Sequence, residues 1–462
     1  MLGKCMRRRD FVRFGGMAAL APLTGAVNVR AEPLPAVDAV REPARDIPVV
    51  GNADVVVCGG GPAGVAAALA AARKGAKTLL LEQHGCLGGI WTAGSLAYLL
   101  DVRNKTGIMA EIVKGMDKAG GRTYTLDGTP TETYDVEVMK LVLDNLCLEA
   151  GLTLQFHTRV AAAVKEGKRL THVITESKSG REAIAGKAFV DATGDGDLGA
   201  LAGCGFDYGE PGTGAAQPMS LIALVSGIQA GDIRAFYRDA ENAQEWGPPK
   251  DALRKAMEAG GHSPSYAMPS LFRVRDDLFI LMANHEYKVC GFDVRDVTQA
   301  TLRARRELHA LIDGLRGTGG VWRNVRLVST AEQIGVREGR RLHGLYTVSA
   351  EDLKQGARFE DAVCRVTFGV DVHALNSDKN RAIDKKVAWR AKPYDIPLRA
   401  LVARDVSGLM FAGRCISGDF IAHSSYRVTG NAVALGEAAG KVCALAALNG
   451  KLPAEVSSRE LG

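Results

Sequence analysis

The chain has 462 residues, of which 47% are apolar and 24% are charged. This composition is typical of a globular protein, and the length exceeds what one hydrophobic core usually organises, so we expect two domains. The net charge is +6, but residues 1–31 hold six basic residues and one acidic residue. The nearly neutral remainder provides no basic field for nucleic acid or an anionic membrane. We therefore predict no nucleic-acid partner and no stable membrane insertion after processing.

The N-terminal segment has the features of an export signal. Arg8-Arg9-Asp10-Phe11-Val12-Arg13 resembles the twin-arginine motif, a weakly apolar run covers residues 14–27, and Val29-Arg30-Ala31 offers a cleavage site. We predict a signal peptide over residues 1–31, recognition by the twin-arginine translocase, and a periplasmic or otherwise exported protein. A disordered basic tail is the alternative. Residues 32–50, which contain four prolines, are expected to form an extended arm.

The most informative stretch runs from Asp54 to Glu82. An apolar run at residues 55–58 predicts a buried strand, an alanine-rich run ending at Lys74 predicts a helix, and residues 77–81 predict a second strand. The turn between the first strand and the helix contains Gly59, Gly61 and Gly64 in G-x-G-x-x-G spacing. Such glycines allow a tight turn, close approach of the backbone to a pyrophosphate, and close helix packing.

This order of elements predicts a dinucleotide site. A pyrophosphate would lie on the free N–H groups at the start of the helix, where the helix dipole favours anions. Glu82 follows the loop by about twenty residues, the spacing at which a carboxylate accepts hydrogen bonds from a ribose. A glycine-rich turn that binds nothing is the alternative.

The next segments predict more of the same domain. Residues 83–94 contain four glycines, which let a backbone press against a flat ligand; a plain connector is the alternative. Residues 135–150 have the apolar spacing of a surface helix. Short apolar runs between residues 152 and 190 predict a small β-meander that returns to the main sheet. It ends in a turn with three aspartates at residues 191–197.

We predict no metal site. The three aspartates could suggest a calcium loop, but the spacing lacks the glutamate that such a loop requires. The nine cysteines are scattered and form no C-x-x-C pair. This pattern matches neither a zinc nor an iron–sulfur site.

Residues 205–395 are expected to form a second domain that binds substrate. Apolar residues at helical spacing predict a helix over residues 297–315, and residues 325–329 predict a strand. From Tyr394 the chain is expected to return to the first domain, which would comprise residues 51–204 and 396–450.

Three arginines in the second domain, Arg337, Arg340 and Arg341, lie within about one helical turn of each other. Arg337 and Arg340 are our predicted substrate ligands, because closely spaced guanidinium groups can clamp a carboxylate or a phosphate. Structural ion pairs with Glu332 and Glu338 are the alternative.

The C-terminal part predicts two short strands and a long helix. The strands are expected over residues 396–402 and 408–413, and a helix rich in Ala and Gly is expected after Gly430, over residues 431–448. Small residues on this helix imply close approach to a sheet or a ligand.

Taken in order, these segments resemble the FAD-dependent oxidoreductase family of the glutathione-reductase-like flavoproteins with two dinucleotide-binding folds. The matching stretches are residues 59–82, 85–94, 190–197, 337–341 with Asp352, and 411–417 with the last helix. The resemblance implies an α/β fold: a Rossmann-like FAD-binding domain, with a parallel sheet, helices and a small β-meander, and an α+β substrate or cap domain. It also implies that FAD lies extended, with its ADP half on the first glycine loop.

The resemblance further implies which residues surround FAD. They are Gly59, Gly61, Pro62, Ala63, Gly64, Glu82, Gln83, Gly88, Gly89, Thr92, Val160, Ala192, Thr193, Gly194, Asp197, Gly413, Arg414, Asp419, Thr429, Gly430 and Asn431. The isoalloxazine ring would lie between the Gly88–Gly89 loop and the start of the last helix. Unpaired N–H groups near Gly430 would stabilise the negative charge of a reduced flavin. Asp419 departs from the small uncharged residues of many relatives and is expected near the ribityl chain.

His423 and Arg427 are the predicted catalytic residues. They lie four residues apart in the segment expected to pass the flavin ring. A histidine there could move a proton while hydride passes to N5, and an arginine could anchor a carboxylate or polarise a carbonyl. The alternative for each is a structural partner of the flavin carbonyls or of buried backbone.

We therefore predict an FAD-dependent oxidoreductase that transfers hydride between a small organic substrate and flavin N5, with an unidentified electron acceptor. A flavin-binding electron relay or assembly subunit without its own substrate is one alternative, and a flavin-dependent double-bond reductase is another. A dithiol reductase is disfavoured, because only Cys86 lies near the Gly88–Gly89 loop and it precedes the glycines. A second G-x-G-x-x-G motif for a nicotinamide is also missing from the sequence.

Overall fold

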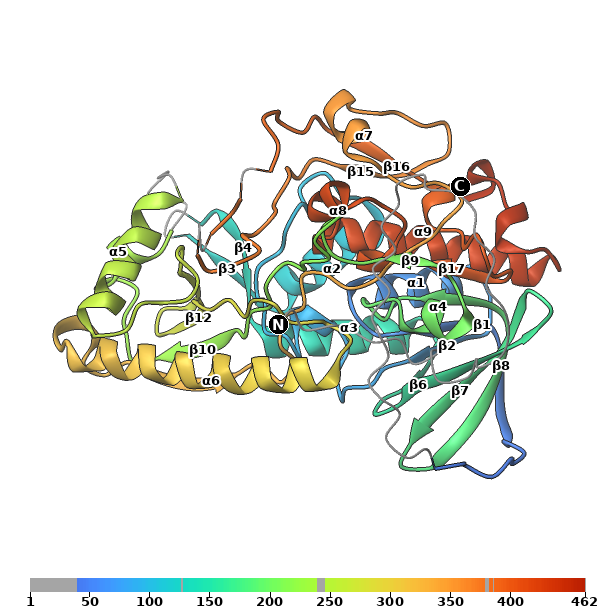
Figure 1. The fold of residues 1–462 in the computed structure, drawn as a ribbon, viewed down its shortest axis with the longest axis horizontal. Helices are drawn as coiled ribbons and strands as arrows, with labels where there is room; N and C mark the ends of the chain where they lie inside the picture. The colour runs from blue at the N-terminus through green and yellow to red at the C-terminus, as the bar shows by residue number, and fades with distance from the viewer. Residues whose placement is uncertain (1–39, 126–127, 239–245, 379–381, 385, 462) are drawn as a thin grey trace.

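The structure is a computed structural model that describes residues 40–125, 128–238, 246–378, 382–384 and 386–461. The predicted signal peptide and the first part of the predicted arm lie outside the described residues. Figure 1 shows a large sheet with its helices on one side of the molecule and a smaller sheet beside a long helix on the other.

The large sheet has seven strands in the order β5-β2-β1-β8-β7-β6, with β17 paired to β8. They are β1 (Val49–Cys58), β2 (Thr78–Leu81), β5 (Thr153–Gln155), β6 (Arg159–Glu166), β7 (Arg169–Ser177), β8 (Gly180–Asp191) and β17 (Leu409–Phe411). β5, β2, β1, β8 and β17 are parallel, whereas β6 and β7 are antiparallel and form the predicted meander. The predicted fold class is confirmed. β1 begins at Val49, so the end of the predicted arm belongs to the sheet.

Strand β8 joins the meander to the parallel sheet because it changes neighbours along its length. Its first half, residues 180–185, pairs with β7, and its last three residues pair with β17. Its other edge pairs with β1 from Ala183 to Asp191. The meander therefore extends one end of β8, and the other end stays free to reach the C-terminal strand.

Two helices from opposite ends of the chain pack against each other over this sheet. They are α1 (Pro62–Arg73) and α9 (Thr429–Leu448). A Cβ on Gly436 or on Gly440 would lie 2.0 Å from the carbonyl oxygen of Ala63 or of Ala67, respectively. The expectation that the small residues of the last helix approach a sheet or a ligand is therefore wrong at these two glycines: they approach another helix backbone. α9 is long and apolar enough to span a membrane, but 72% of its most apolar window is buried inside the protein, as in a core helix.

A helical layer lies next to α1. It consists of α2 (Gly107–Lys118) and α3 (Val136–Glu149), joined by the hairpin β3 (Arg122–Tyr124) and β4 (Pro130–Tyr134). The Asp135 side chain accepts hydrogen bonds from the N–H groups of Glu137 and Val138, which caps α3. The predicted surface helix over residues 135–150 is thus present, with an apolar face that contacts α1 and α2.

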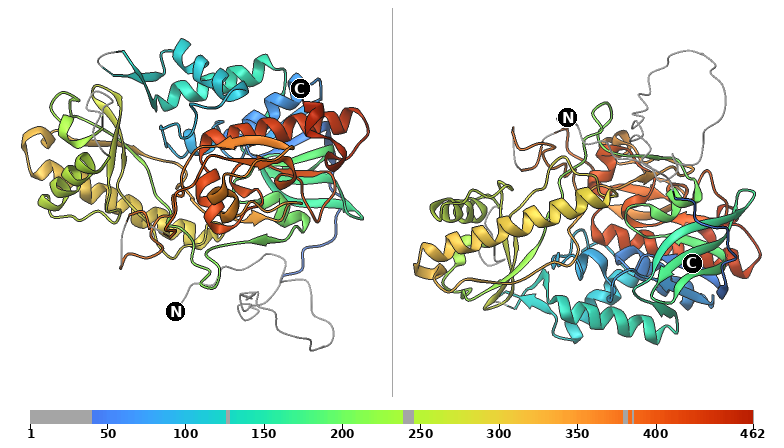
Figure 2. Two further views of the ribbon diagram at one scale, coloured as in Figure 1. Left: turned by 90° about the horizontal axis from the view of Figure 1, so that it is seen from above. Right: turned by 60° about the horizontal axis from the view of Figure 1, so that its bottom comes forward.

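The second sheet is antiparallel and lies in the other lobe. Its order is β11-β12-β10-β13, formed by β10 (Ala223–Ser226), β11 (Ser270–Arg275), β12 (Leu278–Met282) and β13 (Arg326–Thr330). Two helices, α5 (Gly247–Ala259) and α6 (Val294–Gly317), accompany it. Figure 2 shows α6 running from this lobe toward the middle of the molecule. Its buried face includes Ala304, Leu308, Leu311 and Leu315, as the periodicity predicts.

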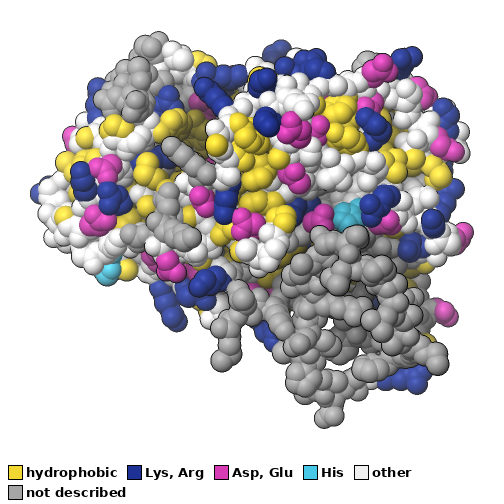
Figure 3. Space-filling view, turned by 45° about the horizontal axis from the view of Figure 1, so that its top comes forward, with side chains coloured by type: hydrophobic (Ala, Val, Ile, Leu, Met, Phe, Trp, Pro, Cys, Tyr) yellow, Lys and Arg dark blue, Asp and Glu magenta, His cyan; other side chains and the backbone are white. Residues whose placement is uncertain are grey.

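The remaining elements connect the two sheets. They are α4 (Asp197–Ala202), β9 (Phe206–Asp207), β14 (Arg341–Leu342), α7 (Ala350–Gln355), β15 (Ala362–Val366), β16 (Tyr394–Pro397) and α8 (Phe420–Tyr426). Residues 337–340 are not helical, so the helical spacing assumed for the three arginines is wrong. The strand predicted over residues 396–402 ends at Pro397, and a 3-10 helix follows at Leu398–Ala400. On the face shown in Figure 3, basic and acidic side chains are interspersed.

The contact between α1 and α9 generates a stability prediction. In Gly436→Ala the new methyl group would clash with the Ala63 carbonyl oxygen, and such overpacking costs about 1–3 kcal/mol. Gly317→Ala is the matched control, because its Cβ would meet nothing within 4 Å. We expect only Gly436→Ala to lower the free energy of unfolding, measured by denaturant titration at saturating FAD. Equal stability of the two variants would contradict the packing described here.

Candidate functional site

Four parallel strands of the large sheet end side by side. Cys58 pairs with Leu81 on one side and with Asp191 on the other, and Asp191 also pairs with Phe411. In open α/β sheets, ligands bind just beyond the carboxyl ends of the strands. The first glycine loop, Glu82, the aspartate turn and the Gly413–Arg414 segment each follow one of these four ends. The structure therefore brings these predicted cofactor segments together at one edge.

The first glycine loop leaves open space at only one of its three motif glycines. Gly59 has φ +102°, and a Cβ there would lie 2.5 Å from the Ala192 carbonyl oxygen. A Cβ on Gly64 would lie 1.7 Å from the Gly59 carbonyl oxygen. Gly61 differs, because its φ is −69° and a Cβ there would meet nothing within 4 Å. Two glycines thus serve the protein's own packing, and Gly61 leaves room at the start of α1, next to Pro62, where anions are favoured.

Glu82 braces this loop from the end of β2. It is 5% exposed; its Oε2 accepts a hydrogen bond from Gly60 N at 2.6 Å, and its Oε1 accepts one from His84 N at 2.8 Å. Each carboxylate oxygen can accept a second hydrogen bond, so the side chain can still bind a ribose hydroxyl. Of the neighbouring predicted residues, Gln83 is exposed and Val160 is buried in β6.

The Gly88–Gly89 loop lies directly on the first loop. Gly88 N donates to Gly60 O at 2.8 Å, and a Cβ on Gly89 would lie 3.0 Å from Gly61 Cα. Both glycines have positive φ, which side chains disfavour. Thr92 Oγ1 donates to Leu87 O at 2.5 Å, so this predicted cofactor ligand closes its own loop.

The aspartate turn after β8 is held from inside. Asp191 is fully buried, and its carboxylate accepts hydrogen bonds from Thr193 N, Thr193 Oγ1 and Gly199 N at 2.7–3.0 Å. Burial raises the pKa of Asp191 to about 6, although these hydrogen bonds oppose the shift. Thr193 Oγ1 also accepts a hydrogen bond from Asp197 N at 2.8 Å. The network fixes the backbone from Ala192 to Asp197 over the end of the strand.

Two arginines hold the same turn from outside. Arg414 Nη2 lies 2.9 Å from Asp195 Oδ1, and a Cβ on Gly194 would lie 2.9 Å from the same nitrogen. Arg340 Nη1 donates to Asp197 Oδ1 and to Asp195 O, both at 2.9 Å. The Arg340 guanidinium also stacks on Phe292, 3.9 Å from the ring centroid. Arg340, predicted as a substrate ligand, is thus engaged by the turn.

The other two arginines of that predicted group have different partners. Arg341 forms a buried ion pair with Glu338 at 2.5 Å, which is the structural pairing considered as the alternative. Arg337 Nη1 donates to Pro218 O and to Ser220 Oγ, both at 2.8 Å. Arg337 and Arg340 therefore share no partner among the described residues, and the structure does not bring them together as a clamp.

The C-terminal helices start close to a loop of the first domain. α9 begins at Thr429, two residues before the predicted start at Asn431, and Gly430 N already donates to Leu100 O at 2.9 Å. That N–H is therefore not unpaired, contrary to the expectation. Asp419 caps α8 by accepting from Ala422 N at 2.7 Å, and its other oxygen accepts from Ala350 N at 2.6 Å. Its carboxylate thus positions α8 and α7.

Several buried polar atoms near these helix starts have no protein partner. His423 is completely buried, and neither of its ring nitrogens has a hydrogen-bond partner. Thr429 Oγ1, Asn431 Nδ2 and Trp91 Nε1 are also buried without a partner. An unpaired buried polar group costs about 1–3 kcal/mol, so a ligand that hydrogen-bonds these atoms would stabilise the region. Together with the open space at Gly61, they fit a polar cofactor such as FAD.

The structure also groups polar residues that the sequence analysis did not single out. These residues come from four segments of the chain and lie near Arg427. They are Gln217, Tyr266, His285, and the neighbours Asp371 and His373. Asp371 and His373 are two residues apart, a spacing that could have drawn attention. Gln217 and His285 carry no such local signal.

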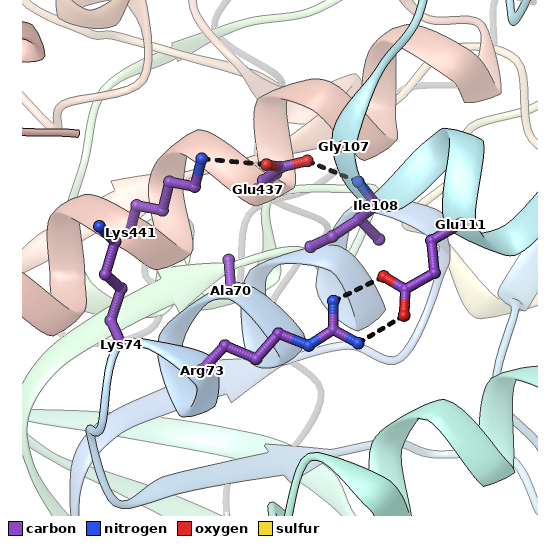
Figure 4. Close-up of a pocket in the computed structure, with 8 residues that line it drawn as sticks. All are labelled: Ala70, Arg73, Lys74, Gly107, Ile108, Glu111, Glu437 and Lys441. Carbon is purple, nitrogen blue, oxygen red and sulfur yellow. Dashed lines mark hydrogen bonds and ion pairs between the residues drawn. The ribbon is translucent and has the colours of Figure 1, made fainter. Parts of the chain in front are cut away.

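A separate pocket of about 290 Å³ lies at the outer end of α1 (Figure 4). Its wall is made by ion pairs: Arg73 donates to both oxygens of Glu111 at 2.6 and 2.8 Å, and Lys441 lies 3.0 Å from Glu437. α1 has 12 residues, so its two ends lie about 18 Å apart at 1.5 Å per residue. The pocket is therefore remote from the glycine loop.

The open space at Gly61 gives a direct test of cofactor binding. In Gly61→Ala the methyl group would occupy the space at the start of α1 without touching the protein. We expect unchanged stability of the FAD-free protein and at least tenfold weaker FAD binding, which corresponds to about 1.4 kcal/mol. Gly64→Ala is the contrasting variant, and it should lower the stability of the FAD-free protein itself. Full FAD affinity in Gly61→Ala would place the pyrophosphate elsewhere.

The buried histidines generate a pH prediction. Burial lowers the pKa of His373 to about 4, whereas an unfolded histidine has a pKa of about 6.5. The unfolded state therefore binds more protons below pH 6.5, and stability is lost as the pH falls from 6.5 toward 4. We expect this residue to reduce the free energy of unfolding by on the order of 2 kcal/mol between pH 7 and pH 5.

Denaturant titrations at the two pH values check this prediction. His373→Gln should remove that part of the pH dependence, and the control His309→Gln, on the exposed side of α6, should retain it. The same pH dependence in both variants would show that His373 is not held neutral in the folded protein.

The chain is similar to one curated relative and to several solved structures. A thiamine thiazole synthase from Methanococcus vannielii is 31% identical over 150 residues, which cover 30% of this chain and 56% of that protein. The chain thus spans about half the length of the curated relative that it matches. One similar solved structure is a geranylgeranyl bacteriochlorophyll reductase-like protein from Thermoplasma acidophilum, with 14% identity, coverage of 89% of this chain and 82% of that chain, and a TM-score of 0.45. Another is a flavin-dependent brominase, with 12% identity, coverage of 89% of this chain and 81% of that chain, and a TM-score of 0.48.

The family comparison covers almost the whole described chain. The profile of the family described as FAD dependent oxidoreductase matches residues 54–462. This range includes the first glycine loop, the aspartate turn and both C-terminal helices. The chain therefore belongs to the FAD dependent oxidoreductase family, and its cofactor is FAD.

Proposed function

We propose that this enzyme oxidises a small organic substrate, with hydride transfer to N5 of the FAD that it binds. His423 would accept the accompanying proton, and Arg427 would hold or polarise the substrate. The observation that carries the proposal is the state of His423. It is completely buried on α8, three residues before the helix ends, and both ring nitrogens lack a protein partner.

The surroundings of His423 keep its imidazole in the neutral form. Burial lowers the pKa of His423 well below its usual range, and the cations Arg341, Arg427 and Arg414 lower it further. A neutral imidazole keeps a lone pair that can take a proton at neutral pH. Loss of hydride and a proton together is the oxidation of an alcohol or an amine, and in that direction a neutral His423 would accept the proton. The lowered pKa by itself favours neither direction.

Arg427 is placed beside this histidine on the same helix. Arg427 N donates to His423 O at 3.2 Å, at the end of α8. Its Nη2 contacts Asp371 O at 2.8 Å, whereas its Nε is buried without a partner. The protein thus holds Nη2, and the neighbouring Nε can donate to a substrate oxygen.

Anaerobic bleaching of the bound flavin by a panel of sugars, hydroxy acids and amines would identify a productive substrate. With that substrate, we expect His423→Gln to retain FAD and to bleach about 10²–10⁴-fold more slowly, the usual contribution of a positioned acid or base. Arg427→Lys should raise the substrate concentration required. His309→Gln is the control and should bleach at the normal rate.

The same experiment separates the alternatives. If His423→Gln and Arg427→Lys both keep FAD and bleach at the normal rate, neither residue is catalytic, and a flavin-binding electron relay without its own substrate gains support. Bleached protein that is reoxidised by an added alkene would instead support a double-bond reductase.

We also propose that the second domain covers the flavin ring and that the fold belongs to the glutathione-reductase-like superfamily.

A further proposal concerns export: the twin-arginine translocase would carry the protein in the folded state. Export is supported by the Arg8-Arg9 motif and by the requirement to load a cofactor before translocation. Replacement of both arginines by lysine should leave the protein in the cytoplasm; continued export would contradict this route.

A further inference from the structure

Deepening the proposed function, on which this inference rests, we propose that the substrate carries a carboxylate. A buried polar cluster formed by residues of the second domain together with Arg427 would bind it. The cluster consists of Gln217, Tyr266, His285, Arg337, Asp371, His373 and Arg427. None of its loop residues belongs to the segments predicted to surround FAD. They lie beside Arg427, which follows His423 by one helical turn. A substrate bound by the cluster would therefore lie near the proposed proton acceptor.

The polar members form one connected network. Gln217 Oε1 accepts a hydrogen bond from His373 N at 3.0 Å and one from Arg427 Nη2 at 3.2 Å. Asp371 Oδ2 lies 3.4 Å from Arg427 Nη2 and 3.5 Å from His373 Nε2. Gln217 and Asp371 therefore contact Arg427 directly, and His373 is linked to it through either of them.

Flat rings form a wall of the cluster. The centroid of the His285 ring lies 4.2 Å from that of Tyr266, with the planes tilted by 34°, and 4.9 Å from that of His373. His285 Nδ1 lies 3.0 Å from Tyr287 Oη. Such an aromatic wall suits a planar group or a compact carbon skeleton better than an extended polar chain.

The cluster holds more positive than negative charge. Arg337 and Arg427 are opposed by Asp371, and Glu338 is already paired with Arg341. His285 and His373 are neutral at pH 7, because burial lowers the pKa of each. Among the described residues Arg337 forms no ion pair, and its hydrogen bonds go to Pro218 O and Ser220 Oγ. A partly buried guanidinium without an anionic partner is costly, so the site is completed by an anion.

The unpaired atoms show what kind of anion is required. Gln217 Nε2, Arg427 Nε, His285 Nε2 and His373 Nδ1 are all buried without a hydrogen-bond partner. The amide and guanidinium nitrogens can only donate, and His285 Nε2 can donate when its Nδ1 accepts from Tyr287 Oη. The neutral His373 ring donates its one N–H to the Asp371 carboxylate, so its Nδ1 can only accept. A carboxylate supplies two acceptor oxygens with about four lone-pair sites and binds arginine in charge-assisted hydrogen bonds. It therefore satisfies several of these donors at once.

Calorimetric titration of the FAD-bound enzyme tests the inference without turnover. The probes are benzoate and glycolate, each compared with its neutral amide, benzamide or glycolamide. We expect the carboxylates to bind at least tenfold more tightly than the amides. Arg337→Leu and the nearly isosteric Gln217→Glu, which cancels the excess positive charge, should each weaken carboxylate binding at least tenfold and retain FAD.

Arg316→Leu is the control for loss of an arginine in the same lobe, because Arg316 pairs with Asp313 on an exposed part of α6. It should leave carboxylate affinity unchanged. The inference is overturned if the amides bind as tightly as the carboxylates, if Gln217→Glu leaves carboxylate affinity unchanged, or if chloride displaces benzoate with equal affinity.

Failure of the carboxylate site can be distinguished from failure of the proposed oxidation. If neutral sugars or amines bleach the flavin and the carboxylates do not bind, hydride transfer stands and the carboxylate receptor fails. If the carboxylates bind as expected and no member of the panel bleaches the flavin, the receptor stands and the proposed oxidation fails.

Discussion

The close contact between α1 and α9 is the constraint on which the rest of the structure depends. Gly436 and Gly440 let the last helix approach the backbone of α1 to a distance that a side chain would prevent. Because α1 starts at the first glycine loop, this contact fixes where the C-terminal helices lie relative to that loop. Thr429, Asn431 and His423 therefore reach the cofactor region although they follow the loop by more than 350 residues.

A second constraint comes from the aspartate turn after β8. Its interior network around Asp191 fixes the backbone, and its outer carboxylates, Asp195 and Asp197, bind Arg414 and Arg340. Arg414 follows the last parallel strand, and Arg340 belongs to the segment that precedes β14. The turn thus links the first domain to the segment that leads from the second sheet. Partly buried, charge-assisted contacts of this kind are more directional than apolar packing.

The two polar regions differ in how their charges are compensated. Around the aspartate turn, each arginine has a carboxylate partner within 2.9 Å. In the cluster around Arg337 and Arg427, two guanidinium groups share one carboxylate, and the buried histidines stay neutral. Fully paired groups stabilise the fold, whereas groups left unpaired in the interior are costly unless a ligand completes them. The distinction separates the structural arginines from the candidate substrate ligands.

The sequence by itself determined a dinucleotide site and the parallel sheet, because the G-x-G-x-x-G spacing, the alanine-rich helix and Glu82 all lie within one βαβ unit, where local spacing dictates geometry. The choice of FAD among dinucleotides came from the family resemblance of the later segments. It also indicated His423 and Arg427 by their place before the last helix. The tertiary structure alone decided that Arg340 binds the aspartate turn and that Arg337 does not join it. It alone brought Gln217 and His285 together with His373, because Gln217 and His285 are single polar residues on separate loops and carry no local signal. Gln217 and His373 meet across 156 residues of chain, a separation that only the tertiary packing of their segments closes.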